Sequence, residues 1–216
     1  MCGKFTQMAS WSEVTQFSRS LARPPGSEGE PGANDDSVVS TPMRFANIIR
    51  LDDAGRREVV AMRWGFAERG AATPARPKHM HARSETIDRL PTFREHFKHR
   101  RGILLTRTFN EGEEVGKRTV QWTITPRDGL PIPIAVIWEE WRNGDMSLLT
   151  YVQVTTPANA LISRITDRMP AILPPETWPI WLGETPAAAE EIKALLKTYD
   201  DDGNWDMAPE PKAPRR

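Results

Sequence analysis

The chain has little of what builds a secreted or membrane-embedded protein. Its 216 residues include a single cysteine, Cys2, which excludes a framework of internal disulfides. No apolar run approaches the ~20 residues that a membrane-spanning helix needs. The first residues, MCGKFTQM, show no cationic stretch followed by an apolar one, so we expect no secretory signal. Because a lone thiol suits a reducing compartment, we predict a cytoplasmic protein with no membrane partner.

An excess of charge of either sign is also absent. The sequence has 29 Lys and Arg against 29 Asp and Glu, which argues against general binding of polyanions. The window from Arg76 to Arg107, however, contains nine basic and three acidic residues, together with all four histidines. Such a local excess can form a phosphate-facing patch, although a run of this kind is also typical of an ordinary solvated surface.

The length and the 38% hydrophobic content suit one domain, which we predict over residues 1–199. A stretch rich in Pro, Gly and acidic residues, 23–37, cannot pack a core and is predicted to be a mobile loop. The end of the chain, 200–216, reads as a flexible tail.

Alternating, β-branched and aromatic residues predict a series of strands, and Asn143-Gly144 predicts a hairpin between the last two. We expect strands at Arg44–Arg50, Glu58–Trp64, Gly102–Thr106, Thr119–Thr125, Ile132–Trp138 and Ser147–Thr155. Helices are expected near 10–21, 91–99, 157–165 and 185–199. This order favours an α+β fold, with a mixed, mostly antiparallel sheet forming a barrel-like core and helices at its periphery.

Cys2 follows the initiator methionine, and Gly3 comes next. Removal of Met1 would leave a free α-amine beside the thiol, and the ordinary pKa values of these two groups are about 7.7–8.0 and about 8.5. A 1,2-aminothiol of this kind condenses with an aldehyde and closes a thiazolidine ring. The alternative is that Cys2 is a small apolar residue buried near the chain end.

Several blocks spread along the chain, taken in order, resemble the SOS-response-associated peptidase (SRAP) family. These blocks are MCGKF, Thr41-Pro42, Arg63–Phe66, His81–Thr86, Arg101–Leu104, Thr108–Gly112, Thr155–Ala160 and Asp167–Leu173. The resemblance implies covalent capture of abasic sites in single-stranded DNA as part of a DNA damage response. We also expect no cofactor, no metal and a monomer.

The resemblance also implies roles for individual residues. Cys2 matches the nucleophile and Glu111 matches an acid/base group near the N-terminal amine. The alternative for Glu111 is an exposed acid in the run Glu111, Glu113 and Glu114.

Arg83 and Arg168 match contacts to DNA phosphates; the alternatives are ion pairs of Arg83 with Glu85 and of Arg168 with Asp167. Lys4 stands where the family usually has arginine. The remaining two positions, Trp64 and Phe66, belong to an apolar edge that we expect to stack on bases.

Two positions depart from the family pattern. His81 stands where the family has asparagine, and Thr166 stands where it has histidine. A threonine hydroxyl cannot shuttle protons near neutral pH. We therefore hypothesise that His81 supplies the imidazole from the opposite wall of the site; the alternative is a merely hydrogen-bonding His81 and weaker catalysis.

Other functions stay open at this point. The chain can be a cysteine autopeptidase or hydrolase that acts on its own N-terminus, or a catalytically weakened module that binds single-stranded DNA. Amidotransferases with an N-terminal nucleophile also begin Met-Cys-Gly. The single Asn-Gly pair, Asn143-Gly144, reads better as a hairpin turn than as the oxyanion hole that such an enzyme needs.

Overall fold

The computed structural model describes residues 3–68, 70–74, 77–200 and 202–210, apart from 8–38. Cys2, the predicted helix at 10–21 and the predicted loop at 23–37 therefore lie outside the described residues. No helix in the described part is long and apolar enough to cross a bilayer.

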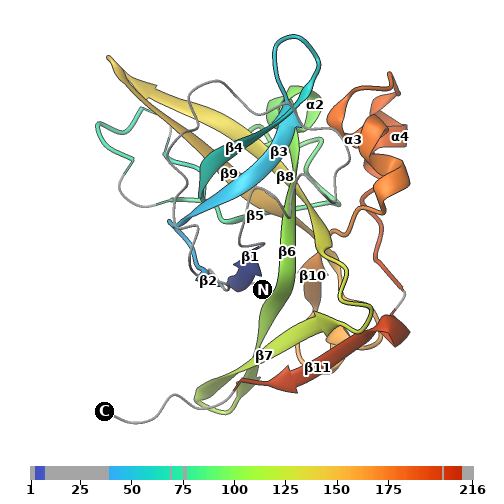
Figure 1. Cartoon of the computed structure of the whole chain (residues 1–216). Helices are drawn as coiled ribbons and strands as arrows, with labels where there is room; N and C mark the ends of the chain where they lie inside the picture. Colours follow the sequence, from blue (N-terminus) through green and yellow to red (C-terminus); the bar gives the residue numbers. More distant parts are fainter. Residues whose placement is uncertain (1–2, 8–38, 69, 75–76, 201, 211–216) are drawn as a thin grey trace.

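One mixed, mostly antiparallel sheet dominates the molecule, as predicted, and the helices are few and short (Figure 1). Its strands are β1 (Lys4–Gln7), β2 (Val39–Ser40), β3 (Phe45–Leu51), β4 (Arg57–Trp64), β5 (His81–Arg83), β6 (Arg101–Val115), β7 (Arg118–Pro126), β8 (Ile132–Asn143), β9 (Met146–Pro157), β10 (Arg168–Pro170) and β11 (Trp205–Pro209). The helices are α2 (Arg94–His99), α3 (Trp178–Leu182) and α4 (Ala189–Ala194), with 3-10 turns at Ile162–Arg164, Pro175–Thr177 and Asp202–Asn204.

The predicted hairpin at Asn143-Gly144 is confirmed. Asn143 lies opposite Met146, and Gly144 has a positive φ of 55°, which the tight turn requires.

Five of the strands pair in a closed ring. β9 pairs with β4, β4 with β3, β3 with β6, β6 with β8, and β8 with β9. Because side chains alternate across a strand, this arrangement gives the sheet an inner and an outer face, each with its own apolar cluster. The inner cluster includes Phe5, Trp64, Phe109 and Tyr151. The outer cluster lies beneath the helices and includes Phe97 and Trp181.

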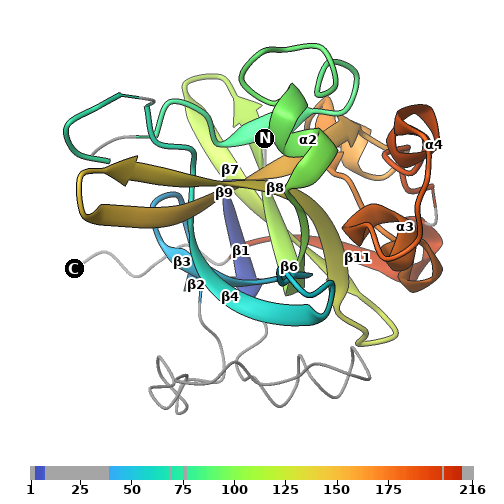
Figure 2. The ribbon, with the colours of Figure 1, turned by 90° about the horizontal axis from the view of Figure 1, so that it is seen from above.

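The N-terminal strand β1 lies against β6, in the interior of the view from above (Figure 2). Phe5 is opposite Phe109 and Lys4 is opposite Asn110, while β2 pairs with the other edge of β1. Phe5 is fully buried, so the start of the chain is anchored in the inner core.

A buried arginine holds the helical side together. The sequence suggests a basic surface patch that includes Arg101, but only 9% of this residue is exposed. Its guanidinium donates to the carbonyls of Phe97 and Lys98 at the end of α2 and to that of Trp181 in α3. These bonds satisfy carbonyls that a helix end leaves without partners.

The C-terminal residues correct the predicted tail. Within the span 200–216, residues Trp205–Pro209 form β11, which pairs with β7. Trp205 is buried, with its ring centroid 5.2 Å from that of Tyr199 and 5.6 Å from that of Phe109. A buried aromatic in a paired strand makes this segment part of the fold.

Candidate active site at the start of the chain

The register of β1 brings Gly3, the first residue that the structure describes, level with a buried carboxyl group. Lys4 lies opposite Asn110, so Gly3 comes level with Glu111, the next residue of β6. Glu111 is completely buried, and it shares the inner face of the sheet with Phe109, two residues earlier. This burial excludes the alternative of an exposed acid in the run Glu111, Glu113 and Glu114.

Trp64 connects this end of β1 to His81. The Trp64 ring centroid lies 5.2 Å from that of Phe5 and 5.7 Å from the His81 imidazole, which meets it edge-on. Trp64 Nε1 donates to the carbonyl of Met80, the residue before His81. The imidazole is half-buried and belongs to β5, which runs parallel to β9. His81 and the N-terminal strand therefore contact the same indole ring.

The same burial corrects the expectation of base stacking. Trp64 is 0% exposed and Phe66 is 2% exposed. Phe66 packs against His96, with ring centroids 5.1 Å apart, and against Phe93. Neither ring presents a face to solvent, because both fill the core that the sheet and α2 need. Their role in this structure is packing.

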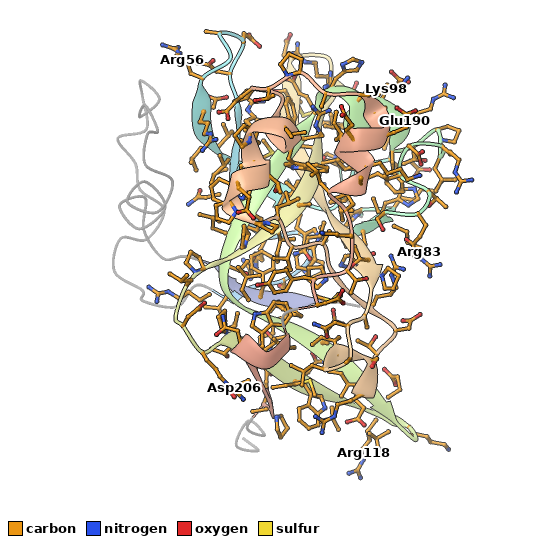
Figure 3. The ribbon with its side chains drawn as sticks, turned by 90° about the vertical axis from the view of Figure 1, so that its right-hand side faces the viewer. Arg56, Arg83, Lys98, Arg118, Glu190 and Asp206 are labelled. Atoms are coloured by element: carbon orange, nitrogen blue, oxygen red, sulfur yellow. The ribbon has the colours of Figure 1, made fainter. Side chains whose placement is uncertain are left out.

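Arg83 is the exposed arginine of the proposed site. It ends β5, and Figure 3 shows its side chain extending away from the ribbon into solvent. Among the described residues it makes no ion pair, so the alternative pair with Glu85 is not formed. A free, exposed guanidinium at the end of a short strand is available for an anionic ligand.

Arg168 is held differently, by a partner that the sequence did not suggest. Its buried guanidinium forms two hydrogen bonds to the Glu85 carboxylate, one of them 2.9 Å long. It also donates to the carbonyl oxygen of Thr155, at 2.7 Å. The hydrogen bonds from Arg168 lower the pKa of Glu85 to about 2, despite the opposing effect of burial. The predicted alternative, a pair with Asp167, is not the one formed.

Two further predicted positions contribute less to the site. Lys4 Nζ lies 2.7 Å from Glu210 Oε1, which joins the N-terminal strand to the residue after β11. Thr166 is half-buried and its backbone N–H donates to Ile162. The Thr166 side chain makes no hydrogen bond to any residue that the structure describes.

Sequence reasoning also missed a buried amide beside His81. Gln153 of β9 is opposite His81 in the parallel register and is fully buried. Neither atom of its amide has a hydrogen-bond partner among the described residues. A signal exists in the sequence, because Gln153 is a lone amide in the otherwise apolar stretch Tyr151–Val154.

The described part of the site offers groups for proton transfer and for binding an anion. Within the described ranges, no three His, Cys, Asp or Glu side chains gather closely enough to hold a metal ion. The buried carboxyl of Glu111 is on β6, next to Gly3 in register. The His81 imidazole contacts the Trp64 ring that Phe5 of β1 also contacts, and the exposed Arg83 ends the same strand as His81.

Comparison with solved structures defines the fold class. A protein from Bacteroides thetaiotaomicron superposes with a TM-score of 0.82 over 98% of this chain and 93% of its own, at 24% identity. A protein from Bordetella bronchiseptica gives a TM-score of 0.78 over 97% of this chain and 100% of its own, at 22% identity. At this level of identity, these likenesses establish the fold.

The sequence comparison then identifies the family. The family described as SOS response associated peptidase (SRAP) matches residues 1–210, so the chain belongs to this family. It is 28% identical over 206 residues to the abasic site processing protein YoqW of Bacillus subtilis, covering 94% of this chain and 89% of the relative. The abasic site processing protein YobE of the same organism is also 28% identical, with 94% of this chain and 91% of the relative covered.

Proposed function

We propose that this chain captures abasic sites in single-stranded DNA through a covalent bond to Cys2, once Met1 has been removed. Membership of the SRAP family and the names of the Bacillus relatives support DNA containing abasic sites as the substrate. The observation that carries the proposal is the register of β1 on β6. It brings Gly3 level with the buried Glu111, so the neighbouring N-terminal amine would begin beside a carboxyl group.

The reaction needs only the aminothiol and a proton shuttle. The α-amine attacks the aldehyde carbon of the ring-opened sugar, and the resulting hydroxyl leaves as water to give an imine. The thiolate then adds to the same carbon, a C–S bond forms, and the imine nitrogen takes a proton. The product is a thiazolidine, and the only by-product is one molecule of water.

Glu111 is the group we assign to these proton transfers. Its carboxylate would accept a proton from the attacking amine and return it to the departing hydroxyl. We therefore expect Glu111→Gln to slow adduct formation while leaving DNA binding nearly unchanged.

We assign to His81 the proton transfer that the Thr166 hydroxyl cannot perform. An imidazole can donate or accept a proton near neutral pH, whereas the threonine hydroxyl cannot. We expect His81→Ala to slow either adduct formation or its reversal. The matched control is His99→Ala, because His99 is exposed on α2 and is not part of the site. Equal rates in both variants and the wild type would leave His81 with a packing role only.

Replacement of Cys2 by Ser tests the chemistry itself. A serine keeps the N-terminal amine but forms a much poorer ring, so its adduct should remain at the imine stage. Wild-type protein should give a gel-stable adduct without reductant, and Cys2→Ser should give one only after borohydride treatment. Equal, reductant-independent adducts from both proteins would contradict the thiazolidine. An absence of adducts from both would favour a non-covalent binding module.

A further inference from the structure

The turn that follows β2 is strained and exposed. Met43 has a φ of 70°, and it is the only residue other than glycine with positive φ among those that the structure describes. A bulky side chain rarely adopts this conformation, and strain of this kind is retained where surrounding bonds enforce it. Met43 is 41% exposed and Phe45 is 52% exposed, with the exposed Arg44 between them.

Two backbone hydrogen bonds fix this turn to Trp64. Met43 N–H donates to the Trp64 carbonyl at 3.0 Å, and Trp64 N–H donates to the Arg44 carbonyl at 2.9 Å. A third bond, from Arg44 N–H to the Thr41 carbonyl, closes the turn. Because Trp64 also contacts Phe5 and His81, the turn is rigidly connected to the proposed site.

The turn also lies near the start of the chain. Ser40 is opposite Phe5 in the antiparallel pairing of β1 and β2. The chain therefore continues from Ser40 into the turn in the direction that leads from Phe5 back toward Gly3. The exposed side chains of Met43 and Phe45 thus lie toward the Gly3 end of β1.

Charge distinguishes this surface from an ordinary apolar patch. Neither the segment Val39–Arg50 nor the segment Val59–Ala67, which meets it across the β3–β4 pair, contains an acidic residue. Arg44 makes no ion pair with the described residues. The other large exposed apolar side chains, Leu90, Val115, Leu130 and Met146, stand singly in the sequence. An apolar pair with a free cation between its members complements a base and its phosphate.

We propose that Met43, Arg44 and Phe45 form the surface on which a base next to the abasic site stacks. Phe45 and Met43 contact the base, and Arg44 contacts the adjoining phosphate. This inference rests on the proposed function, and it assigns base stacking to the surface turn instead of the buried Trp64 and Phe66. The strain at Met43 is then the cost of holding two apolar side chains outward.

The test uses single-stranded DNA with an unreactive tetrahydrofuran abasic analogue and 2-aminopurine on either side of it. Stacking quenches the fluorescence of 2-aminopurine, so titration reports both contact and affinity. We expect Phe45→Ala to restore fluorescence at one flanking position and to weaken binding roughly 5- to 100-fold. Phe45→Leu should recover only part of the affinity, because it restores apolar area without a ring.

The matched control for Met43→Ala is Met146→Ala, which truncates a similarly exposed methionine in the β8–β9 hairpin. Met43→Ala should weaken binding and Met146→Ala should not. Quenching and affinity unchanged in Phe45→Ala would overturn the proposal. Because the analogue has no aldehyde, this result is independent of Cys2. Failure of wild-type protein to form an adduct with true abasic DNA would instead count against the proposed function.

Discussion

The choice of ion-pair partner by Glu85 distinguishes Arg83 from Arg168. Its carboxylate takes the buried guanidinium of Arg168 and leaves Arg83, two residues earlier, without an ion pair among the described residues. The two arginines that matched phosphate contacts in the family thus differ in this structure. Arg168 is held within the fold, whereas Arg83 is exposed (Figure 3).

The Glu85–Arg168 pair predicts a pH-dependent contribution to stability. The pKa of Glu85 is about 2 in the folded protein, whereas an unperturbed glutamate has a pKa of 4.5. Its stabilising effect is therefore complete above about pH 5 and is lost as pH falls toward 2. Glu85→Gln should lower the free energy of unfolding by about 1 kcal/mol at pH 7, a modest value because 47% of the Glu85 side chain is exposed.

Urea unfolding at several pH values checks this expectation. The difference between wild type and Glu85→Gln should shrink steadily as the pH is lowered from about 5 to about 3. A difference that is constant over this range would show that the ionised carboxylate is not what stabilises Arg168.

Arg83 should affect the salt dependence of DNA binding. Each phosphate contact on a single strand contributes about 0.7 to the slope of log affinity against log salt concentration. Arg83→Ala should reduce the slope by about this amount. Arg118→Ala provides the control, because Arg118 is also exposed but lies at the distant end of the β6–β7 hairpin (Figure 3). Equal slopes for both variants would place Arg83 outside the DNA track.

At the scale of elements, the chain after β4 depends on one glycine. Gly65 has a φ of 104°, and a Cβ atom there would lie 2.4 Å from Pro77 Cβ. Its N–H donates to the Tyr151 carbonyl at 2.7 Å, which fixes the end of β4 against β9. Gly65→Ala should lower the free energy of unfolding by about 2–4 kcal/mol, from backbone strain together with the clash.

Gly55→Ala separates these two causes. Gly55 also has a positive φ, 74°, but a Cβ there would meet nothing within 4 Å. This variant should lose only about 1 kcal/mol in the same denaturation experiment. Equal losses at the two positions would mean that the chain near Pro77 moves aside readily and does not fix Gly65.

The elements that the sequence predicted well are those with a local signal. Apolar alternation located β3, β4 and β9 to within two residues at each end, and Asn143-Gly144 located the last hairpin. The alternation also located the start of β8, which runs to Asn143, five residues beyond the predicted end. The helix expected over 185–199 shrinks to α4, which begins at Ala189. There the Glu191 carboxylate accepts a hydrogen bond from the Ala188 N–H, three residues before it. Thr185-Pro186 therefore predicts a helix start one turn too early.

The features that the sequence did not predict depend on long-range pairing. The parallel register of β5 on β9 sets His81 against Gln153, and nothing near either residue encodes it. In the same way, Glu85 reaches Arg168 across 83 positions. The burial of Trp64 and Phe66 follows from closure of the sheet and from α2, so their aromatic character alone could not separate core packing from base stacking.

For the molecule as a whole, an ion pair joins the first strand of the described chain to the residue that follows its last strand. Lys4 of β1 pairs with Glu210, which also accepts a hydrogen bond from Asn110 of β6. β11 lies beside β7 in Figure 1, and its Trp205 completes the inner core. The segment 205–210, which the sequence predicts to be part of a tail, therefore supports β6, the strand that carries Glu111.

Trp205→Ala tests this contribution. Truncation of a buried tryptophan typically costs about 3–5 kcal/mol, and we expect a loss in this range, measured by chemical denaturation. Asp206→Ala is the control on the same strand, because Asp206 is exposed and its pair with Arg127 should contribute less than about 1 kcal/mol. Equal losses of unfolding free energy at the two positions would show that burial of Trp205 does not stabilise the fold.

The proposed capture of abasic DNA depends on an N-terminal aminothiol that reacts with a sugar aldehyde. Intact-mass spectrometry of the purified full-length protein, before and after incubation with single-stranded abasic DNA, tests it most directly. We predict a chain that begins at Cys2 and gains the mass of the oligonucleotide less one water. A protein that retains Met1, or that lacks Met1 and gains no mass, would contradict this mechanism.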